Sequence, residues 1–239
     1  WFRRLPAGAV DEKARHDLVS TADRASEAAI LEAIRHRFPT HRVLSEEAGA
    51  VGDGDGPTWV VDPLDGTTNF VHGFPHCAVS VAVVEEGRAQ VGVVLDPFRD
   101  DVFRAARGHG AWWNGRRVRV SERDRLDLAL LTTGFPFRSM HCLEPYLAIL
   151  RDLLPRCQGV RRPGSAALDL AHVACGIFAG FFEYAQSPWD VAAGIVLVEE
   201  AGGVVTDLAG GGEVLLSGDV LAATPAVHRE LLEVVRRHG

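Results

Sequence analysis

Two aspartates three residues apart follow an apolar segment in the first half of the chain. Residues 59–61 read Trp-Val-Val, as expected of a buried strand, and Asp62 and Asp65 come directly after it. Hard cations prefer oxygen ligands, and two carboxylates beside the backbone carbonyl of Leu64 supply them. Gly66 permits a tight turn after the second acid. The spacing therefore predicts a divalent-metal site at the end of a strand.

The residues after Gly66 favour a phosphate site beside the metal site. Thr67 and Thr68 suit the start of a short helix, and backbone amides at a helix start can bind phosphate. The alternative is that Asp-Pro and Asp-Gly are ordinary turn signals. We disfavour that reading because the strand, the paired acids, the glycine and the threonines all agree.

Further acids could complete the metal site. One member of the Glu46–Glu47 pair is expected to reach it, although an exposed acidic loop is the alternative. Asp190 precedes an apolar helix, where it could cap the helix and also bind metal. Burying such carboxylates together without a cation would be severely unfavourable. The set therefore predicts bound Mg²⁺, about two or three ions.

Long motifs give the chain a family resemblance. Residues 59–75 resemble the first signature of the inositol monophosphatase family, the lithium-sensitive, Mg²⁺-dependent sugar-phosphate phosphatases. Residues 187–194, followed by 199–203, resemble the second signature. Other family landmarks are matched at residues 17–24, 45–47, 132–136 and 162–167, so the resemblance runs from about Lys13 to the C-terminus. Two long signatures in the right order are highly specific.

The resemblance implies a fold and an activity. The fold would be α/β and layered, an alternating helix-sheet-helix-sheet-helix sandwich of the inositol monophosphatase and fructose-bisphosphatase type. The activity would be Mg²⁺-dependent hydrolysis of a small phosphate monoester by metal-activated water, with inositol monophosphate as the first candidate. Family analogy also suggests a homodimer.

The resemblance also implies residue roles. The metal ligands would be Glu46, Asp62, the Leu64 carbonyl, Asp65 and Asp190. Glu46 would bridge metal and water, Thr67 would bond the water or the phosphate, and Asp23 would support Thr67. Substrate contacts would come from Asp65, Gly66, Thr67, Arg161, Gly164, Ser165, Ala166, Glu183 and Asp190. For Arg161 a surface position on a strand is equally compatible with the sequence.

The sequence does not identify the leaving group of the phosphate ester. The shared motifs bind metal and phosphate, so fructose 1,6-bisphosphate, histidinol phosphate and a nucleotide 3′-phosphate remain alternatives. A different class of function is a family-like scaffold that docks a transcription or translation partner. The intact acidic set argues against a loss of catalysis, and the sequence alone does not choose the substrate.

Composition narrows the class of partner and the cellular location that the sequence allows. The chain has 239 residues, 47% of them hydrophobic, and a net charge of −7. The sequence pI is about 5.8, which makes nucleic acid a poor candidate partner. The four cysteines form no Cys-x-x-Cys pair, and no membrane-length apolar run or signal-peptide core is visible, so a reduced cytoplasmic setting is expected.

The expected elements form one phosphatase domain over 1–239, with a metal- and phosphate-binding half (1–121) and a substrate-specificity half (122–239). In the first half we expect a helix at 21–37 and strands at 42–44, 77–86, 89–95, 102–106 and 118–120. A flexible loop at 51–56 could close over the site. In the second half we expect helices at 143–154, 165–175, 191–201 and 226–237. Strands are expected there at 128–132, 159–162, 178–184, 204–206, 215–216 and 220–222.

Overall fold

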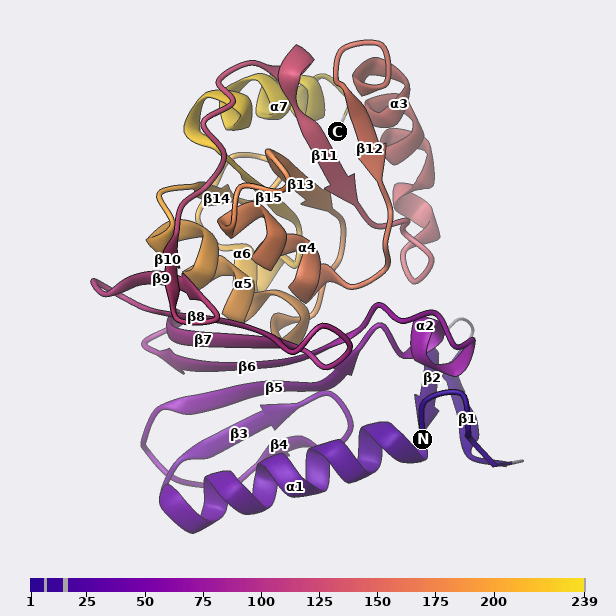
Figure 1. Cartoon of the computed structure of the whole chain (residues 1–239), viewed down its shortest axis with the longest axis vertical. Helices are drawn as coiled ribbons and strands as arrows, with labels where there is room; N and C mark the ends of the chain where they lie inside the picture. Colours follow the sequence, from indigo (N-terminus) through magenta and orange to yellow (C-terminus); the bar gives the residue numbers. More distant parts are fainter. Residues whose placement is uncertain (7, 15–16, 239) are drawn as a thin grey trace.

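The computed structural model describes residues 1–6, 8–14 and 17–238, and its helices and sheets alternate in layers (Figure 1). The layers are, in order, α1 (Thr21–Arg37), an eight-stranded sheet, the pair α4 (Ala166–Ala174) and α5 (Pro188–Glu200), a five-stranded sheet, and the pair α3 (Leu143–Leu153) and α7 (Pro225–His238). The layered helix-sheet-helix-sheet-helix sandwich predicted from the sequence is confirmed.

The two sheets divide the strands by sequence. The first has the order β10-β9-β8-β7-β6-β5-β3-β4 and the second the order β12-β11-β13-β15-β14. The first sheet contains β3 (Arg42–Ser45), β4 (Gly49–Val51), β5 (Thr58–Asp65), β6 (Ala78–Glu85), β7 (Arg88–Asp96), β8 (Asp101–Ala106), β9 (Gly110–Trp113) and β10 (Arg116–Val118). The second contains β11 (Leu130–Thr133), β12 (Gly159–Arg161), β13 (Gly180–Glu183), β14 (Val204–Thr206) and β15 (Val220–Ala223). A separate hairpin is formed by β1 (Val10–Ala14) and β2 (Asp17–Ser20), and the short helices are α2 (Thr67–Val71) and α6 (Val214–Ser217).

Helix α1 has the predicted bounds. Its start is a capping box, in which the Ser20 hydroxyl accepts from the backbone and the Asp23 carboxylate accepts from the Ser20 backbone N–H. Its buried residues Leu31 and Ile34 pack on Val43 and Val61 of the first sheet. The helix therefore covers the outer face of the sheet and presents Asp23 at its first turn.

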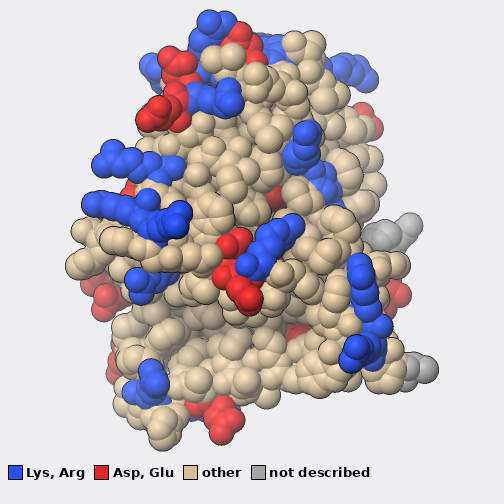
Figure 2. Space-filling view, in the orientation of Figure 1, with Lys and Arg blue, Asp and Glu red and all other residues tan. Residues whose placement is uncertain are grey.

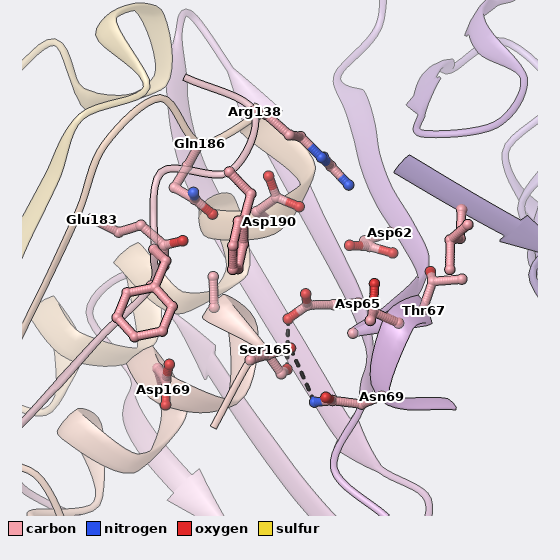
Figure 3. A pocket seen from close by; sticks show the side chains of 18 of the residues that line it. Asp62, Asp65, Thr67, Asn69, Arg138, Ser165, Asp169, Glu183, Gln186 and Asp190 are labelled. Carbon is pink, nitrogen blue, oxygen red and sulfur yellow. Dashed lines mark hydrogen bonds between the residues drawn. The ribbon is translucent and has the colours of Figure 1, made fainter. Parts of the chain in front are cut away.

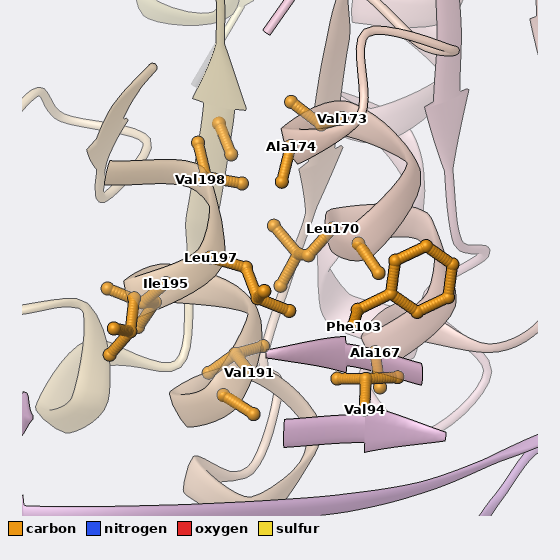
Figure 4. Close-up of a cluster of buried hydrophobic side chains, with 14 of the residues drawn as sticks. Val94, Phe103, Ala167, Leu170, Val173, Ala174, Val191, Ile195, Leu197 and Val198 are labelled. Atoms are coloured by element: carbon orange, nitrogen blue, oxygen red, sulfur yellow. The ribbon is translucent and has the colours of Figure 1, made fainter. Parts of the chain in front are cut away.

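Helix α5 packs closely on its neighbours because two contact positions are glycines. A Cβ on Gly92 of β7 would lie 2.5 Å from the Ala193 carbonyl oxygen, and one on Gly194 would lie 2.4 Å from the Leu170 Cβ. The apolar core between the sheets continues through Val94, Leu170 and Val191 (Figure 4). This packing fixes the middle of α5 against the first sheet.

Some local predictions were wrong. Residues 215–216 belong to the one-turn helix α6, which ends at Gly218 in a left-handed conformation, and not to a strand. Residues 118–120 were expected as a strand, but β10 covers Arg116–Val118 and pairs with β9 across the Asn114–Gly115 turn. Strand β9 and the β1–β2 hairpin were not predicted.

The loop at 51–56 does not close over the site. In the β3–β4 pair, Ser45 lies opposite Gly49 and Val43 opposite Val51. The chain therefore leaves β4 at the end of β3 remote from Glu46. A Cβ on Gly54 would lie 1.7 Å from the Thr40 carbonyl oxygen, which places the loop against that remote end.

Surface charge on the face shown in Figure 2 is dispersed. Basic side chains lie there singly or in small groups between larger uncharged areas. Among the described residues, no helix has the length and apolar character that crossing a bilayer requires.

Candidate active site

A cleft of about 460 Å³ opens where the end of β5 meets the starts of α4 and α5. Its walls come from both halves of the sequence, with Asp62 and Thr67 on one side and Glu183 and Asp169 on the other (Figure 3). The last residues of a strand and the first turns of two helices thus converge on one space. Such convergence suits the binding of a cation and a phosphate.

Three carboxylates meet in the cleft. One oxygen each from Asp62, Asp65 and Asp190 lies within 4.8 Å of the others. Asp62 and Asp65 end β5, and Asp190 is fixed by the capping box of α5, where the Ser187 backbone N–H donates to its Oδ2 at 2.7 Å. Hard oxygen donors at this spacing fit Mg²⁺.

The charge of this group needs compensation. Burial, followed by repulsion from Glu46 and Asp65, raises the pKa of Asp62 well above its ordinary value. Burial and the charge of Asp65 raise the pKa of Asp190 to about 7. A divalent cation would offset both the burial cost and the repulsion, which is what a metal-ligand set requires.

Asp65 is also tied to the second half of the chain. Its Oδ2 accepts from the Ser165 hydroxyl at 2.6 Å and from the Ala167 backbone N–H at 2.8 Å. Ser165 caps α4 as well, accepting from the Leu168 backbone N–H. These bonds fix the orientation of the Asp65 carboxylate, and they place Ser165 and the neighbouring Gly164 and Ala166 in the cleft wall.

Thr67 and Asp23 are in direct contact. The turn at Gly66, where φ is 90°, starts α2 at Thr67. The Thr67 hydroxyl lies 2.8 Å from Asp23 Oδ1 and 3.0 Å from the Leu64 carbonyl oxygen. The other oxygen of Asp23 accepts from the hydroxyl and the backbone N–H of Ser20. The first turn of α1 therefore orients the Thr67 hydroxyl.

Glu46 lines the same cleft immediately after β3. Its backbone N–H donates to the Val61 carbonyl at 3.2 Å, which holds it beside the strand that carries Asp62. Its negative charge contributes to the raised pKa values of both Asp62 and Asp190. The parallel pairing of β3 and β5 thus brings the Glu46 loop and the two aspartates to one edge of the sheet.

Glu183 occupies the opposite wall at the end of β13. A Cβ on Gly134 would lie 1.8 Å from its Oε1, so the glycine makes room for this carboxyl group. Burial raises the pKa of Glu183 to about 8, although the charges of Arg162 and Arg138 act in the other direction. Among the described residues, its side chain has no hydrogen-bond or ion-pair partner.

The placement of Arg161 corrects the prediction made for it. Arg161 is exposed, its guanidinium donates to the Val160 carbonyl at 3.2 Å, and it does not line the cleft. Arg162 lines the cleft instead. Successive residues of an extended segment point to opposite sides. Which of the two arginines faces the cleft therefore depends on how β12 pairs in the sheet.

Other cleft residues were not found from the sequence. Asn69 lies within the first signature, and its amide donates to the carbonyls of His76 and Pro163 at 2.8 and 2.9 Å, joining α2 to the loop before α4. Arg138 and Asp169 also line the cleft. No sequence signal marked Asp169, because an acid inside an apolar helix is not in itself a functional pattern.

A sequence profile of the inositol monophosphatase family matches residues 3–239. The chain belongs to this family. The resemblance stated from the two signatures is therefore confirmed. With the family established, the acidic cleft at the junction of both halves corresponds to a region expected to bind metal and phosphate, while the individual residue roles stay predictions.

Members of the family from several bacteria are similar over most of their length. The Nus factor SuhB of Pseudomonas aeruginosa is 48% identical over 242 residues, which cover 99% of this chain and 89% of that protein. The extragenic suppressor protein suhB of Bartonella henselae has a solved structure with a TM-score of 0.92 and 41% identity, covering 95% of this chain and 88% of that one. The inositol monophosphatase of Anabaena (Nostoc) sp. PCC 7120 has a TM-score of 0.86 and 45% identity, with 91% and 87% covered.

Proposed function

We propose that this protein is an Mg²⁺-dependent phosphatase of small phosphate monoesters, with inositol monophosphate as the first candidate substrate. The observation that carries the proposal is the convergence of Asp62, Asp65 and Asp190, whose oxygens lie within 4.8 Å of one another. Membership of the inositol monophosphatase family supports the same chemistry.

The residues of the cleft have complementary roles in this proposal. Asp62, Asp65 and Asp190, with Glu46 and the Leu64 carbonyl, would hold about two or three Mg²⁺ ions. When bound, Mg²⁺ neutralises charge on the phosphate and lowers the pKa of an attacking water.

The remaining groups position the reactants. The Thr67 hydroxyl donates its one proton to Asp23 at 2.8 Å, so its oxygen would accept a hydrogen bond from the attacking water. The amides of Gly66 and Thr67 at the start of α2 lie beside the phosphate position. Ser165 and Glu183 face the leaving group from the second half, and Glu46 orients the water.

A panel of phosphate monoesters tests the proposal. Inositol 1-phosphate, fructose 1,6-bisphosphate, histidinol phosphate and a nucleotide 3′-phosphate are compared by kcat/KM with Mg²⁺ and with chelator. We expect turnover only with Mg²⁺ and the highest kcat/KM for inositol 1-phosphate. Full activity in chelator contradicts the mechanism, and a higher kcat/KM for another ester corrects the substrate alone.

A second candidate is partner binding. Relatives of this chain carry the name Nus factor SuhB, which supports docking of a partner from the transcription machinery. The two functions separate experimentally in Asp62→Asn, because the Asp62 side chain is buried in the cleft. We expect this variant to lose phosphate release and to keep any partner captured by the wild-type chain in a pull-down.

Other properties belong to the same proposal. We propose a single domain over 1–239, a homodimer and inhibition by Li⁺, all by family analogy, and a cytoplasmic location, which the four free cysteines favour. Sedimentation and turnover at high Li⁺ and low Mg²⁺ test the dimer and the inhibition. Nucleic acid stays a poor candidate partner, given the net charge of −7.

A further inference from the structure

The side-chain amide of Asn69 is surrounded by backbone carbonyl groups from both halves of the chain. Its Nδ2 donates to the carbonyl oxygens of His76 at 2.8 Å, Pro163 at 2.9 Å and Gly164 at 3.2 Å. Three acceptors around this atom require a nitrogen there, because an amide oxygen would face them without a proton. Asn69 of α2 therefore binds the segment before β6 to the segment before α4, and it lies beside Ser165 (Figure 3).

Two glycines allow these segments to approach one another. A Cβ on Gly66 would lie 3.1 Å from the carbonyl oxygens of both His76 and Gly164, and one on Gly164 would lie 3.1 Å from the Asn69 Nδ2. Both glycines are in the left-handed region, with φ values of 90° and 94°. Gly66 directly follows Asp65, so two of the carbonyls that Asn69 binds also lie against the backbone next to this aspartate.

The residues that Asn69 holds come immediately before the two donors to Asp65. The Ser165 hydroxyl donates to Asp65 Oδ2 at 2.6 Å, and the Ala167 backbone N–H donates to the same oxygen at 2.8 Å. A shift of the segment at Pro163 and Gly164 would move both donors together. It would therefore change the orientation of the Asp65 carboxylate, one of the three acids whose oxygens lie within 4.8 Å of one another.

We propose that Asn69 is a positioning residue for the metal site. Its amide holds the start of α4 against α2, so that Ser165 and Ala167 fix the Asp65 carboxylate in the orientation that a divalent cation requires. Loss of a group that directly orients a metal ligand typically weakens metal binding about ten- to a hundredfold. Asn69 acts one step further away, so its effect should be smaller. The inference rests on the proposed Mg²⁺-dependent function.

A double-mutant cycle tests whether Asn69 acts through Asp65. The dissociation constant of Mn²⁺, which like Mg²⁺ suits oxygen ligands, is measured by electron paramagnetic resonance for the wild type, Asn69→Ala, Ser165→Ala and the double variant. We expect Asn69→Ala to raise the Kd about five- to tenfold. Because both side chains act on Asp65, the double variant should lose less affinity than the product of the two single losses. A loss equal to that product, or an unchanged Kd in Asn69→Ala, overturns the proposal.

Asn114 provides a matched control for a merely structural role. Its amide also joins two segments, accepting from the Val102 backbone N–H and donating to Asp101 Oδ1, both at 2.8 Å, but it does not line the cleft. We expect Tm to fall in both Asn69→Ala and Asn114→Ala, and the Mn²⁺ Kd to rise only in the first. A similar rise in both would assign the effect to general loosening. If Asn69→Ala does not fold, Asn69→Ser keeps a shorter donor, and an unchanged Kd in that variant overturns the proposal.

Hydrogen exchange in the metal-free protein separates this inference from the proposed function. The Ala167 backbone N–H, which donates to Asp65, is followed by NMR in the wild type, Asn69→Ala and Asn114→Ala. We expect its exchange to become at least about fivefold faster in Asn69→Ala alone. If the wild type binds no Mn²⁺ or hydrolyses no ester, the proposed function fails, and the Ala167 exchange rate still decides the role of Asn69. An unchanged rate in Asn69→Ala overturns the inference.

Discussion

The two ends of the cleft differ in how the protein satisfies their acids. At the phosphate end, Asp65 accepts two hydrogen bonds from the start of α4, and Asp23 joins Ser20 to Thr67. At the far end, Glu183 has no partner among the described residues and Asp169 has an unbonded oxygen. The Asp65 end, where phosphate is proposed to bind, is therefore held by bonds within the chain, whereas polar atoms at the far end have no partner among the described residues.

The proposed phosphatase function accounts for this difference. Every phosphate monoester presents the same phosphate group, so its site gains from groups fixed in advance by the fold. The leaving group differs between esters, and unpaired polar groups discriminate among leaving groups because a wrong one leaves them buried and unbonded. Mutations at the two ends should therefore have different effects on different substrates.

The largest effect is expected from loss of a metal carboxylate. Asp62→Asn replaces a charged ligand by a neutral amide, so kcat/KM should fall more than about a hundredfold for every ester alike. Chelator should abolish turnover in the wild type, and Mg²⁺ should restore it. Residual activity that is insensitive to chelator, or a loss confined to one ester, would contradict the view that the Asp62 end acts alike on every ester.

A smaller loss is expected when the Thr67 hydroxyl is disturbed. Thr67→Val removes the hydroxyl, and Asp23→Asn weakens the contact that orients it at 2.8 Å. We expect kcat to fall about a hundredfold for the first and about tenfold for the second, again on all esters. Equal kcat values for Asp23→Asn and the wild type would show that the contact does not position Thr67.

Glu183→Ala should act on specificity. It removes an acceptor for substrate hydroxyls, so kcat/KM for inositol 1-phosphate should fall about ten- to a hundredfold. The fall for p-nitrophenyl phosphate, which has no polyol, should be much smaller. Equal losses on both esters would assign Glu183 a structural role and remove the distinction between the two ends.

Gly134→Ala tests the space occupied by Glu183. The new Cβ would meet the Glu183 Oε1 at 1.8 Å, so we expect a loss of about 1–3 kcal/mol in the free energy of unfolding. The control is Gly212→Ala, where nothing lies within 4 Å and the change should stay within about 0.5 kcal/mol. Neither glycine is in the left-handed region. Similar unfolding free energies for both variants would show that the Glu183 wall is not rigid.

The smallest effect concerns pH. Burial raises the pKa of Glu183 from 4.5 to about 8, so the folded protein keeps a proton that the unfolded chain has released. Its contribution to stability is present below pH 4.5 and is lost as the pH rises through about 8. In chelator, urea unfolding of the wild type should weaken over this range more than that of Glu183→Gln. Parallel curves would show that Glu183 does not retain its proton.

Elements with a local signal were predicted well. The expected helix at 21–37 begins after the Ser20 cap, and the expected strands at 77–86 and 89–95 are joined as β6 and β7 by the turn at Glu86–Gly87, because these elements depend on neighbouring residues. Residues 215–216 were misassigned because two apolar residues in a row do not distinguish a strand from one helical turn. The loop at 51–56 was misplaced because the antiparallel pairing of β3 and β4 is not local information.

The sequence alone predicted Asp62, Asp65 and Thr67 as site residues, because they lie within six residues of one strand-to-helix turn. The family of the chain was also predicted from this segment, together with the second signature. Only the tertiary structure decided that Arg162 rather than Arg161 lines the cleft, and that Asp169 and Glu183 lie there too. These residues come from separate elements, and their meeting depends on how the second sheet and α4 pack, which no short stretch of sequence encodes.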